Sequence, residues 1–287
     1  LLNAVGSGET AAFLQADNSQ PPITAMVNTV KATSEEALQS LREAGVEAEP
    51  HPWLESCFVL SRSGNVEALD AFQRGLFYVQ DAASRLAVEA LDPRPGMKVL
   101  DMCAAPGGKS FAAAIRMGDV GEVWSCDLHP HKKTLIQNGA QRLGLTCIHP
   151  KTADGKVHRP EWENAFDRVL VDAPCSGLGV IRKKPDIRYK DAAPLAGLPQ
   201  VQSAILDNAA SYVKPGGVLV YSTCTILERE NRGVTDAFLS AHPEFHREAL
   251  SLPGPAGEIP EGQITLWPQV HGTDGFYICK LRKDGTP

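Results

Sequence analysis

The distribution of apolar residues along the chain changes near residue 76. Beyond this point, short and nearly continuous apolar runs alternate with longer stretches that carry apolar residues at helical spacing. Strands buried on both faces of a parallel sheet have this continuous apolar character, so the pattern predicts a doubly wound α/β domain over residues 76–287. The expected strands are 97–100, 122–126, 145–148, 166–172, 218–222 and 276–281, and the expected helices are 82–91, 111–117, 131–143 and 199–213.

Residues 21–75 have the pattern of a small α+β module. Apolar runs predict strands at 23–30 and 57–61. Thr33 and Glu36 have the spacing of a capping box, which predicts the start of a helix that ends at Gly45. Residues 1–20 have no strong period, and we predict that they form a linker or the remnant of a missing N-terminal domain.

The composition is that of a soluble globular protein, with 43% hydrophobic and 22% charged residues. No apolar run approaches the roughly 20 residues that a membrane-spanning helix needs, so we expect no membrane partner. The seven cysteines are scattered without a Cys-x-x-Cys pair, which argues against a zinc ribbon and a paired disulfide framework. We therefore expect no bound metal and a reducing, cytoplasmic location.

The stretch Asp101–Ser110 is predicted to be the turn between a buried strand and a helix. Open α/β sheets bind their ligands at such strand ends. Gly107 and Gly108 allow a close approach of the backbone to a ligand, and the first turn of the helix offers unpaired N–H groups and the positive end of its dipole. The turn is therefore predicted to bind a cofactor.

The residues of this turn restrict the choice of cofactor. A Walker A loop requires a glycine where Cys103 stands, and the G-x-G-x-x-G spacing of dinucleotide sites is absent. The next strand ends in Asp127, which is placed to accept hydrogen bonds from ribose hydroxyls. A ribose site without a pyrophosphate site suggests S-adenosylmethionine.

Two cysteines directly follow predicted strands. Cys175 lies in the loop 172–177, and Cys224 lies in the loop 222–225. An isolated cysteine is more often a small core residue than a nucleophile, but two at strand ends on one sheet edge favour chemistry. A reactive thiol requires a nearby cation or helix N-terminus, and Lys109 is a candidate cation. From these residues alone, either cysteine is eligible as the nucleophile.

Three motifs, 101–109 (DMCAAPGGK), 172–177 (DAPCSG) and 223–224 (TC), resemble in this order those of the Sun family of RNA cytosine-5 methyltransferases. The layout, which includes 78–81 (YVQD), 182–186 (RKKPD) and 274–277 (DGFY), is similar to the bacterial branch that modifies small-subunit ribosomal RNA. The resemblance implies a Rossmann-like methyltransferase fold preceded by an RNA-recognition-like module. It also implies an upstream NusB-type helical domain, which this chain lacks.

The resemblance assigns roles to the site residues. Cys224 would attack carbon 6 of cytosine, and Cys175 would assist release by helping to remove the proton from carbon 5. Asp172 and Lys109 would lie near the pyrimidine ring and the methionine moiety. The implied S-adenosylmethionine contacts are Cys103, Ala104, Ala105, Pro106, Gly107, Gly108, Lys109, Asp127, Lys132, Asp154 and Asp172. Lys132 stands where the family usually has Arg, and Asp154 beside Gly155 also fits a simple turn.

The net charge of −6 lies entirely in residues 1–75, which contain four basic and ten acidic residues. The rest of the chain contains 24 of each, so local patches decide whether it binds nucleic acid. Basic runs are commonly solvated surface, but one that follows the Cys175 loop is placed to contact RNA phosphates. Its basic residues are Arg182, Lys183, Lys184, Arg188 and Lys190.

The sequence thus predicts an S-adenosylmethionine-dependent RNA cytosine-5 methyltransferase that acts as a monomer on 16S ribosomal RNA. A transfer-RNA enzyme of the same chemistry is one alternative, because the core motifs do not encode the target. A cofactor-binding RNA scaffold without turnover is another, although the intact Cys175, Cys224 and Lys109 argue against it. An amino-methyltransferase would need an aromatic residue at position 175.

Overall fold

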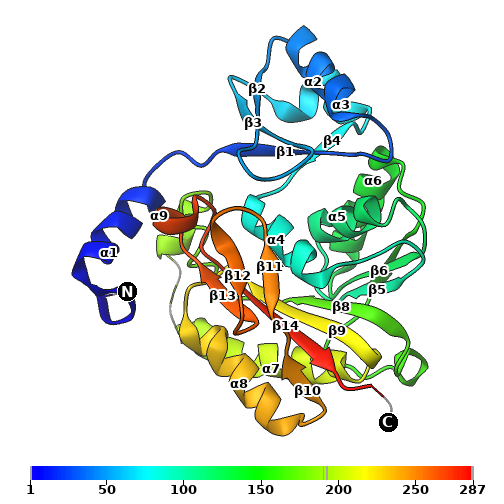
Figure 1. Cartoon of the computed structure of the whole chain (residues 1–287), viewed down its shortest axis with the longest axis vertical. Helices are drawn as coiled ribbons and strands as arrows, with labels where there is room; N and C mark the ends of the chain where they lie inside the picture. Colours follow the sequence, from blue (N-terminus) through cyan, green and yellow to red (C-terminus); the bar gives the residue numbers. More distant parts are fainter. Residues whose placement is uncertain (1, 190, 192, 286–287) are drawn as a thin grey trace.

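The computed structural model describes residues 2–189, 191 and 193–285, and it contains a small sheet and a large sheet. The small sheet has the order β2-β3-β1-β4 with antiparallel neighbours, and α2 and α3 pack beside it (Figure 1). Its elements are β1 (Ile23–Val27), α2 (Ser34–Glu43), β2 (Glu47–Pro50), β3 (Cys57–Ser61), α3 (Asp70–Gln73) and β4 (Phe77–Val79). The predicted α+β module is therefore present as a compact unit.

The predicted capping box of α2 is confirmed. The Glu36 N–H donates to Thr33 Oγ1 at 3.2 Å, and the Thr33 N–H donates to Glu36 Oε2 at 2.8 Å. Strand β2 escaped prediction because its exposed, polar sequence has no apolar period. Our placement of residues 77–79 in the large domain is wrong, since β4 pairs with β1 and the fully buried Phe77 packs in the core of the small unit.

The large sheet confirms the expected doubly wound architecture. Its order is β10-β14-β9-β8-β5-β6-β7, with β13 paired to β14, and β5 to β9 run parallel while β14 is antiparallel to β9. Helices α4, α5 and α6 cover one face, and α7 and α8 cover the other (Figure 1). The elements are α4 (Ala82–Leu91), β5 (Lys98–Asp101), α5 (Gly108–Arg116), β6 (Glu122–Asp127), α6 (Pro130–Leu143), β7 (Ile148–Thr152), β8 (Phe166–Asp172), α7 (Leu198–Ala210), β9 (Val213–Thr223), α8 (Arg232–Ala241), β10 (Phe245–Arg247), β11 (Leu250–Leu252), β12 (Gly257–Ile259), β13 (Gln263–Leu266), α9 (Pro268–His271) and β14 (Phe276–Lys283).

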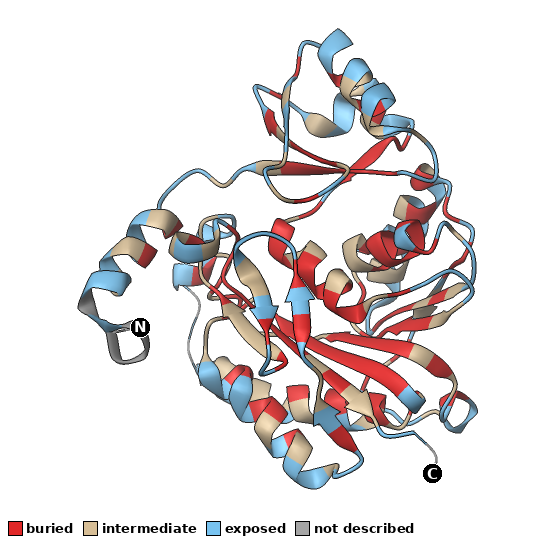
Figure 2. Ribbon diagram, viewed as in Figure 1, coloured by how far each residue is buried: buried red, intermediate tan, exposed pale blue. Residues whose placement is uncertain are grey.

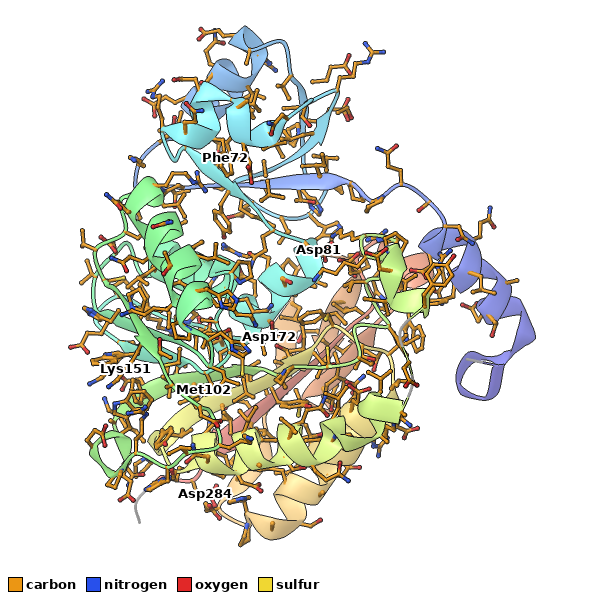
Figure 3. All side chains as sticks on the ribbon, turned by 180° about the vertical axis from the view of Figure 1, so that it is seen from behind. Phe72, Asp81, Met102, Lys151, Asp172 and Asp284 are labelled. Carbon is orange, nitrogen blue, oxygen red and sulfur yellow. The ribbon has the colours of Figure 1, made fainter. Side chains whose placement is uncertain are left out.

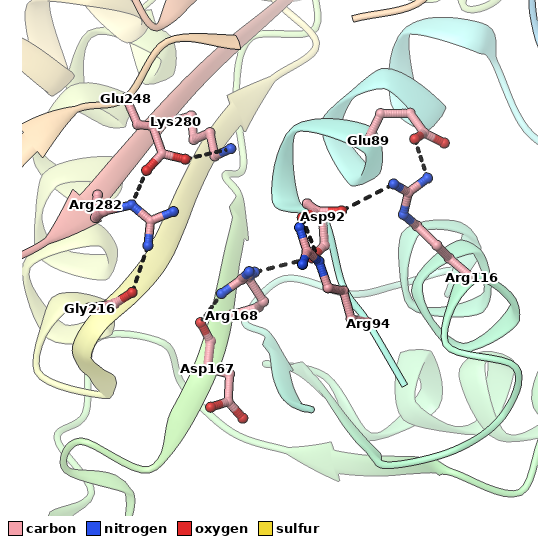
Figure 4. Close-up of polar contacts among 10 residues, drawn as sticks. All are labelled: Glu89, Asp92, Arg94, Arg116, Asp167, Arg168, Gly216, Glu248, Lys280 and Arg282. Carbon is pink, nitrogen blue, oxygen red and sulfur yellow. Dashed lines mark hydrogen bonds and ion pairs between the residues drawn. The ribbon is translucent and has the colours of Figure 1, made fainter. Parts of the chain in front are cut away.

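The central strands of the large sheet form the core. Figure 2 shows buried residues along β8, β9 and β14 and on the inner side of α4. At the amino ends of the parallel strands lie two separate groups of ion pairs and hydrogen bonds, one joining α4, α5 and β8 and one on β14 (Figure 4). Arg116 pairs there with Glu89 and with Asp92, the latter at 3.1 Å, and Glu248 pairs with Lys280 at 2.7 Å and with Arg282.

The prediction that residues 1–20 form a linker is wrong for most of their length, because α1 spans Leu2–Asp17. The side chain of Phe13 is 1% exposed and meets the ring of Trp267, next to α9, edge-on at 5.9 Å between centroids. The non-helical Gly6 (φ 77°) interrupts the helix, so its apolar residues follow no single period. The interpretation of this segment as a domain remnant stays a prediction.

Within the described ranges, no helix combines the length and the apolar character needed to cross a bilayer. The same ranges contain no group of three or more His, Cys, Asp or Glu side chains arranged to hold a metal ion.

Candidate active site

The turn between β5 and α5 is fixed by buried hydrogen bonds and by a glycine. Ser110 Oγ donates to Asp101 Oδ2 at 2.8 Å, and Ser125 Oγ donates to Ser110 Oγ at 2.7 Å. Burial raises the pKa of Asp101 to about 7. Gly107 caps α5 at φ 116°, and a Cβ there would lie 2.3 Å from the ring of Phe111. Any other residue at position 107 would therefore strain the turn.

This turn opens onto a cavity of about 780 Å³ at the carboxyl ends of the parallel strands. Figure 3 shows Asp172 near the middle of the molecule, with Asp81 closer to the small sheet. The predicted site residues that line the cavity are Cys103, Ala105, Pro106, Lys109, Asp127, Lys132, Asp154, Asp172, Cys175, Lys183, Lys184 and Cys224. Ala104, Gly107 and Gly108 shape the turn behind this lining. The cavity thus unites residues from five separate loops.

Cys175 and Cys224 meet in this cavity with their Sγ atoms 3.2 Å apart. The hydrogen bond from Cys175 lowers the pKa of Cys224, and the Lys109 and Lys184 cations lower it further against the effect of burial. The same hydrogen bond raises the pKa of Cys175 well above its usual range. Geometry and charge therefore favour the thiolate on Cys224 and the proton on Cys175. Burial raises the pKa of Cys103, which argues against a nucleophilic role for that thiol.

Lys109 and Asp172 form a largely buried ion pair beside the two thiols. Lys109 Nζ lies 2.6 Å from Asp172 Oδ2, and the side chains are 12% and 26% exposed. Ser222 Oγ donates to Asp172 Oδ1 at 2.8 Å. Burial alone would lower the pKa of Lys109, but the Asp172 carboxylate outweighs burial and the pKa is raised. Lys109 is therefore a fixed positive charge at neutral pH, and it also faces the ring of Phe276 at 5.2 Å.

The acids predicted to hold the cofactor line another part of the cavity. Asp127 ends β6, and its Oδ1 accepts from the His129 N–H at 3.1 Å and lies 3.7 Å from Lys132 Nζ. Asp127 Oδ2 has no hydrogen bond within the part of the chain that the structure describes. Asp154 accepts from the Lys156 N–H at 2.9 Å, so this residue both forms the simple turn and lines the cavity.

Two residues of the basic run after Cys175, Arg182 and Lys183, form ion pairs within the protein. Arg182 Nε donates to Asp274 Oδ1 at 2.8 Å, and the Arg182 side chain is only 5% exposed. Lys183 Nζ lies 2.5 Å from Asp81 Oδ2 and 2.7 Å from Asp274 Oδ2. This burial argues against the predicted phosphate contact of Arg182.

The other basic residues of the run are more accessible. Lys184 is exposed at the cavity, and Arg188 donates to Asn18 Oδ1 at 2.7 Å. Lys190 lies outside the described residues. Phosphate contacts by Lys184 and Arg188 stay predictions.

Several cavity residues have no role assigned from the sequence. Asp81 caps α4 by accepting from the Ala83 N–H at 2.8 Å, and its second oxygen faces Lys183. The sequence marks Asp81 as a candidate helix cap and as part of the 78–81 motif of the family resemblance, and neither predicts that it lines the cavity. The small unit also contributes residues 21–24 and Val79 to the lining, which only the relative placement of the two sheets reveals.

Comparisons with known proteins cover both sheets. Residues 88–282 match the family model described as 16S rRNA methyltransferase RsmB/F, and residues 1–67 match the ferredoxin-like domain of RsmF/B-like methyltransferases. The probable ribosomal RNA small subunit methyltransferase B of Bacillus subtilis is 44% identical over 272 residues, which are 92% of this chain and 60% of that protein. The chain thus spans about three fifths of the length of this relative.

Two solved structures share the fold over nearly the whole chain. The crystal structure of the protein PH0851 has a TM-score of 0.92 and 35% identity, and the match covers 98% of this chain and 64% of that one. A methyltransferase homolog protein from Pyrococcus horikoshii has a TM-score of 0.80 and 29% identity, with 98% and 92% covered.

Proposed function

The chain belongs to the RsmB/F family of 16S rRNA methyltransferases, and from this premise we propose that it transfers a methyl group from S-adenosylmethionine to carbon 5 of a cytosine in 16S rRNA. The observation that carries the proposal is the pair of thiols 3.2 Å apart, which shares one cavity with the glycine turn and Asp127. Carbon 5 of cytosine is a weak nucleophile, so its methylation needs a group that adds to carbon 6. In the pair of thiols, the pKa of Cys224 is lowered and that of Cys175 is raised, so the Cys224 thiolate can supply that group.

Cys224 is the nucleophile in this proposal. Its pKa is lowered by the hydrogen bond from Cys175, so the thiolate forms more readily on Cys224 than on an ordinary cysteine. The addition of the thiolate to carbon 6 moves negative charge onto the pyrimidine ring. The Lys109–Asp172 pair lies in the same cavity and would stabilise that charge through the buried cation and its hydrogen-bonded partner.

Cys175 is the group that completes the reaction. Carbon 5 is adjacent to the carbon that Cys224 attacks, and Cys175 Sγ lies 3.2 Å from the attacking sulfur. We assign Cys175 to the removal of the carbon 5 proton. Once Cys224 is bonded to carbon 6, Cys175 releases its own proton to solvent, and its thiolate then takes the carbon 5 proton. The electron pair of that C–H bond restores the double bond between carbons 5 and 6 as the bond between Cys224 and carbon 6 breaks, which releases the product and the Cys224 thiolate. Two thiols with separate tasks explain why their pKa values are pushed in opposite directions.

The donors and acceptors of the cavity fit S-adenosylmethionine, which supplies an electrophilic methyl group when bound. Asp127 Oδ2 is available to the ribose hydroxyls, since only Oδ1 is used by His129. The first turn of α5 has no side-chain cap, so its N–H groups are available to the methionine carboxylate. The residues that would hold the ligand are Cys103, Ala105, Pro106, Lys109, Asp127, Lys132, Asp154 and Asp172.

The RNA would lie across the mouth of the cavity, where Lys184 and Arg188 contact its phosphates in this proposal. A base must leave any stack to reach Cys224, and a base in a loop is extracted at the lowest free-energy cost. We further propose a monomeric, cytoplasmic enzyme.

The proposal is tested by methyl transfer from labelled S-adenosylmethionine to unmodified 16S rRNA and, in parallel, to transfer RNA. Mass spectrometry then identifies the modified base, and Cys224→Ala is the matched control without a nucleophile. 5-Methylcytosine in 16S rRNA is the expected product. Label confined to transfer RNA would overturn the target, and cofactor binding without label in either RNA would overturn the activity of this chain.

A further inference from the structure

The two cysteine loops rest on a buried polar layer that the mechanism above leaves unused. The chain folds back after Cys224 so that Glu230 and Asn231, which precede α8, lie beneath both loops. Their exposures are 0% and 2%. Adjacent residues of one turn therefore reach two loops that are separated by about fifty positions in the sequence.

Glu230 holds the backbone on both sides of Cys175. Its Oε2 accepts from the Ser176 N–H at 2.9 Å and from Gln202 Nε2 at 3.0 Å. The same Gln202 Nε2 donates to the Pro174 carbonyl at 3.0 Å. The residue before Cys175 and the residue after it are thus tied to one carboxylate.

Asn231 holds Cys224 in a matching way. Its Oδ1 accepts from Thr223 Oγ1 at 2.5 Å, and its Nδ2 donates to the Thr225 carbonyl at 2.9 Å. The two loops are also joined directly, because Ser176 Oγ and Thr225 Oγ1 lie 2.7 Å apart. Each thiol is therefore held by hydrogen bonds to both of its neighbours in the chain.

We propose that Glu230 and Asn231 are positioning residues that hold Cys175 and Cys224 at the 3.2 Å separation on which their division of roles depends. Neither residue lines the cavity, so they act through the loops and not on the substrate. A separation of 3.2 Å between two sulfurs from independent loops is sensitive to small loop shifts, and an Sγ displaced by an ångström would weaken the hydrogen bond between the thiols.

The chemistry of Glu230 supports a role beyond filling space. Within the described ranges its carboxylate forms no ion pair, and Oε1 is buried without a hydrogen-bond partner. A buried carboxylate without a cation is costly, and an apolar residue of similar size would fill the space at lower cost. What Glu230 adds is an acceptor that takes two hydrogen bonds at once on Oε2.

Glu230→Met is the informative substitution. It approximately preserves the length of the side chain but has no oxygen to accept from the Ser176 N–H or from Gln202 Nε2, so both donors lose this acceptor. The inference rests on the proposed function, because it treats the two cysteines as the reacting thiols. Its test uses the full chain without RNA, so a failed methylation assay and a failed positioning test remain distinguishable.

The test measures the alkylation of Cys224 by iodoacetamide from pH 5 to 10, with the modified peptides quantified by mass spectrometry. In Glu230→Met and in Asn231→Ala we expect the midpoint to rise by about one pH unit, which is a roughly tenfold slower reaction at pH 7. The cause is the loss of the hydrogen bond from Cys175. Binding of S-adenosylmethionine, measured by calorimetry, should stay within twofold of the parent value.

Glu228→Met is the matched control, because Glu228 is exposed and its side chain makes no hydrogen bond to either loop. It should leave the midpoint unchanged. Gln202→Met offers a second test that keeps the carboxylate, and it should shift the midpoint in the same direction by a smaller amount. A folded Glu230→Met or Gln202→Met protein with the parent midpoint would overturn the proposal, as would an equal shift in Glu228→Met.

Discussion

Substitution of Lys109, which belongs to a largely buried ion pair, should lower the free energy of unfolding far more than substitution of the cation of an exposed ion pair of similar length. The Lys109–Asp172 pair is 2.6 Å apart with side chains 12% and 26% exposed. Loss of one partner of a buried pair costs about 3–5 kcal/mol, because the other charge is left buried without compensation. Because Asp172 is partly exposed, we expect Lys109→Met to lower the free energy of unfolding by about 3 kcal/mol, which corresponds to a fall in Tm of about 6–12 °C.

The exposed pair Arg62–Glu47 provides the comparison. Its atoms are 2.8 Å apart, but its side chains are 82% and 55% exposed, so Arg62→Met should cost less than about 1 kcal/mol. Thermal unfolding followed by circular dichroism measures both. A double variant, Lys109→Met with Asp172→Asn, should lose less than the sum of the two single losses, by about 1–3 kcal/mol.

The pH dependence follows from the sign of the shift. The pKa of Lys109 is raised, so its contribution to stability is present at neutral pH and is lost only as the pH rises through the pKa of the folded protein, above the ordinary 10.5. Equal losses for Lys109→Met and Arg62→Met at pH 7, or strict additivity in the double variant, would refute the description of Lys109 and Asp172 as a buried unit.

Other predictions concern the turn, the basic run and a buried acid. Gly107→Ala should weaken binding of S-adenosylmethionine and lower the Tm, since its Cβ would meet Phe111; calorimetry and thermal unfolding measure these effects. Lys184→Ala should reduce the slope of the logarithm of the RNA-binding constant against the logarithm of salt concentration by about one, which filter binding measures. Arg182→Ala should instead lower the Tm in thermal unfolding. Asp101 has a pKa of about 7 in the folded protein and an ordinary value of 3.8, so the free energy of unfolding should fall as the pH rises from 4 to 7. Asp101→Asn should remove this trend, worth on the order of 4 kcal/mol, in urea titrations across that range.

The elements that the sequence predicts well are those whose local pattern and final burial agree. The strand expected at 166–172 is observed at Phe166–Asp172, because its apolar run is buried on both faces. The helix that follows Thr33 begins where its capping box indicates. The cysteines could be assigned to one edge because the carboxyl ends of parallel strands share that edge.

The features that escaped prediction depend on contacts between distant segments. Helix α1 is held by the contact of Phe13 with Trp267, which is more than 250 positions away, and the hydrophobic pattern of residues 1–20 does not predict that contact. The strand expected at 145–148 is observed at Ile148–Thr152, where the polar residues lie along the edge of the sheet. The burial of Arg182 depends on Asp274, and a basic run in a sequence does not reveal which of its members are already paired.

The division of roles between the two cysteines is tested most directly by the covalent complex with RNA. Parent protein, Cys175→Ala and Cys224→Ala would each be incubated with S-adenosylmethionine and unmodified 16S rRNA, then resolved on a denaturing gel, with the crosslinked peptide identified by mass spectrometry. The account predicts a stable adduct through Cys224 in Cys175→Ala and none in Cys224→Ala. An adduct through Cys175, or free turnover by Cys175→Ala, would contradict it.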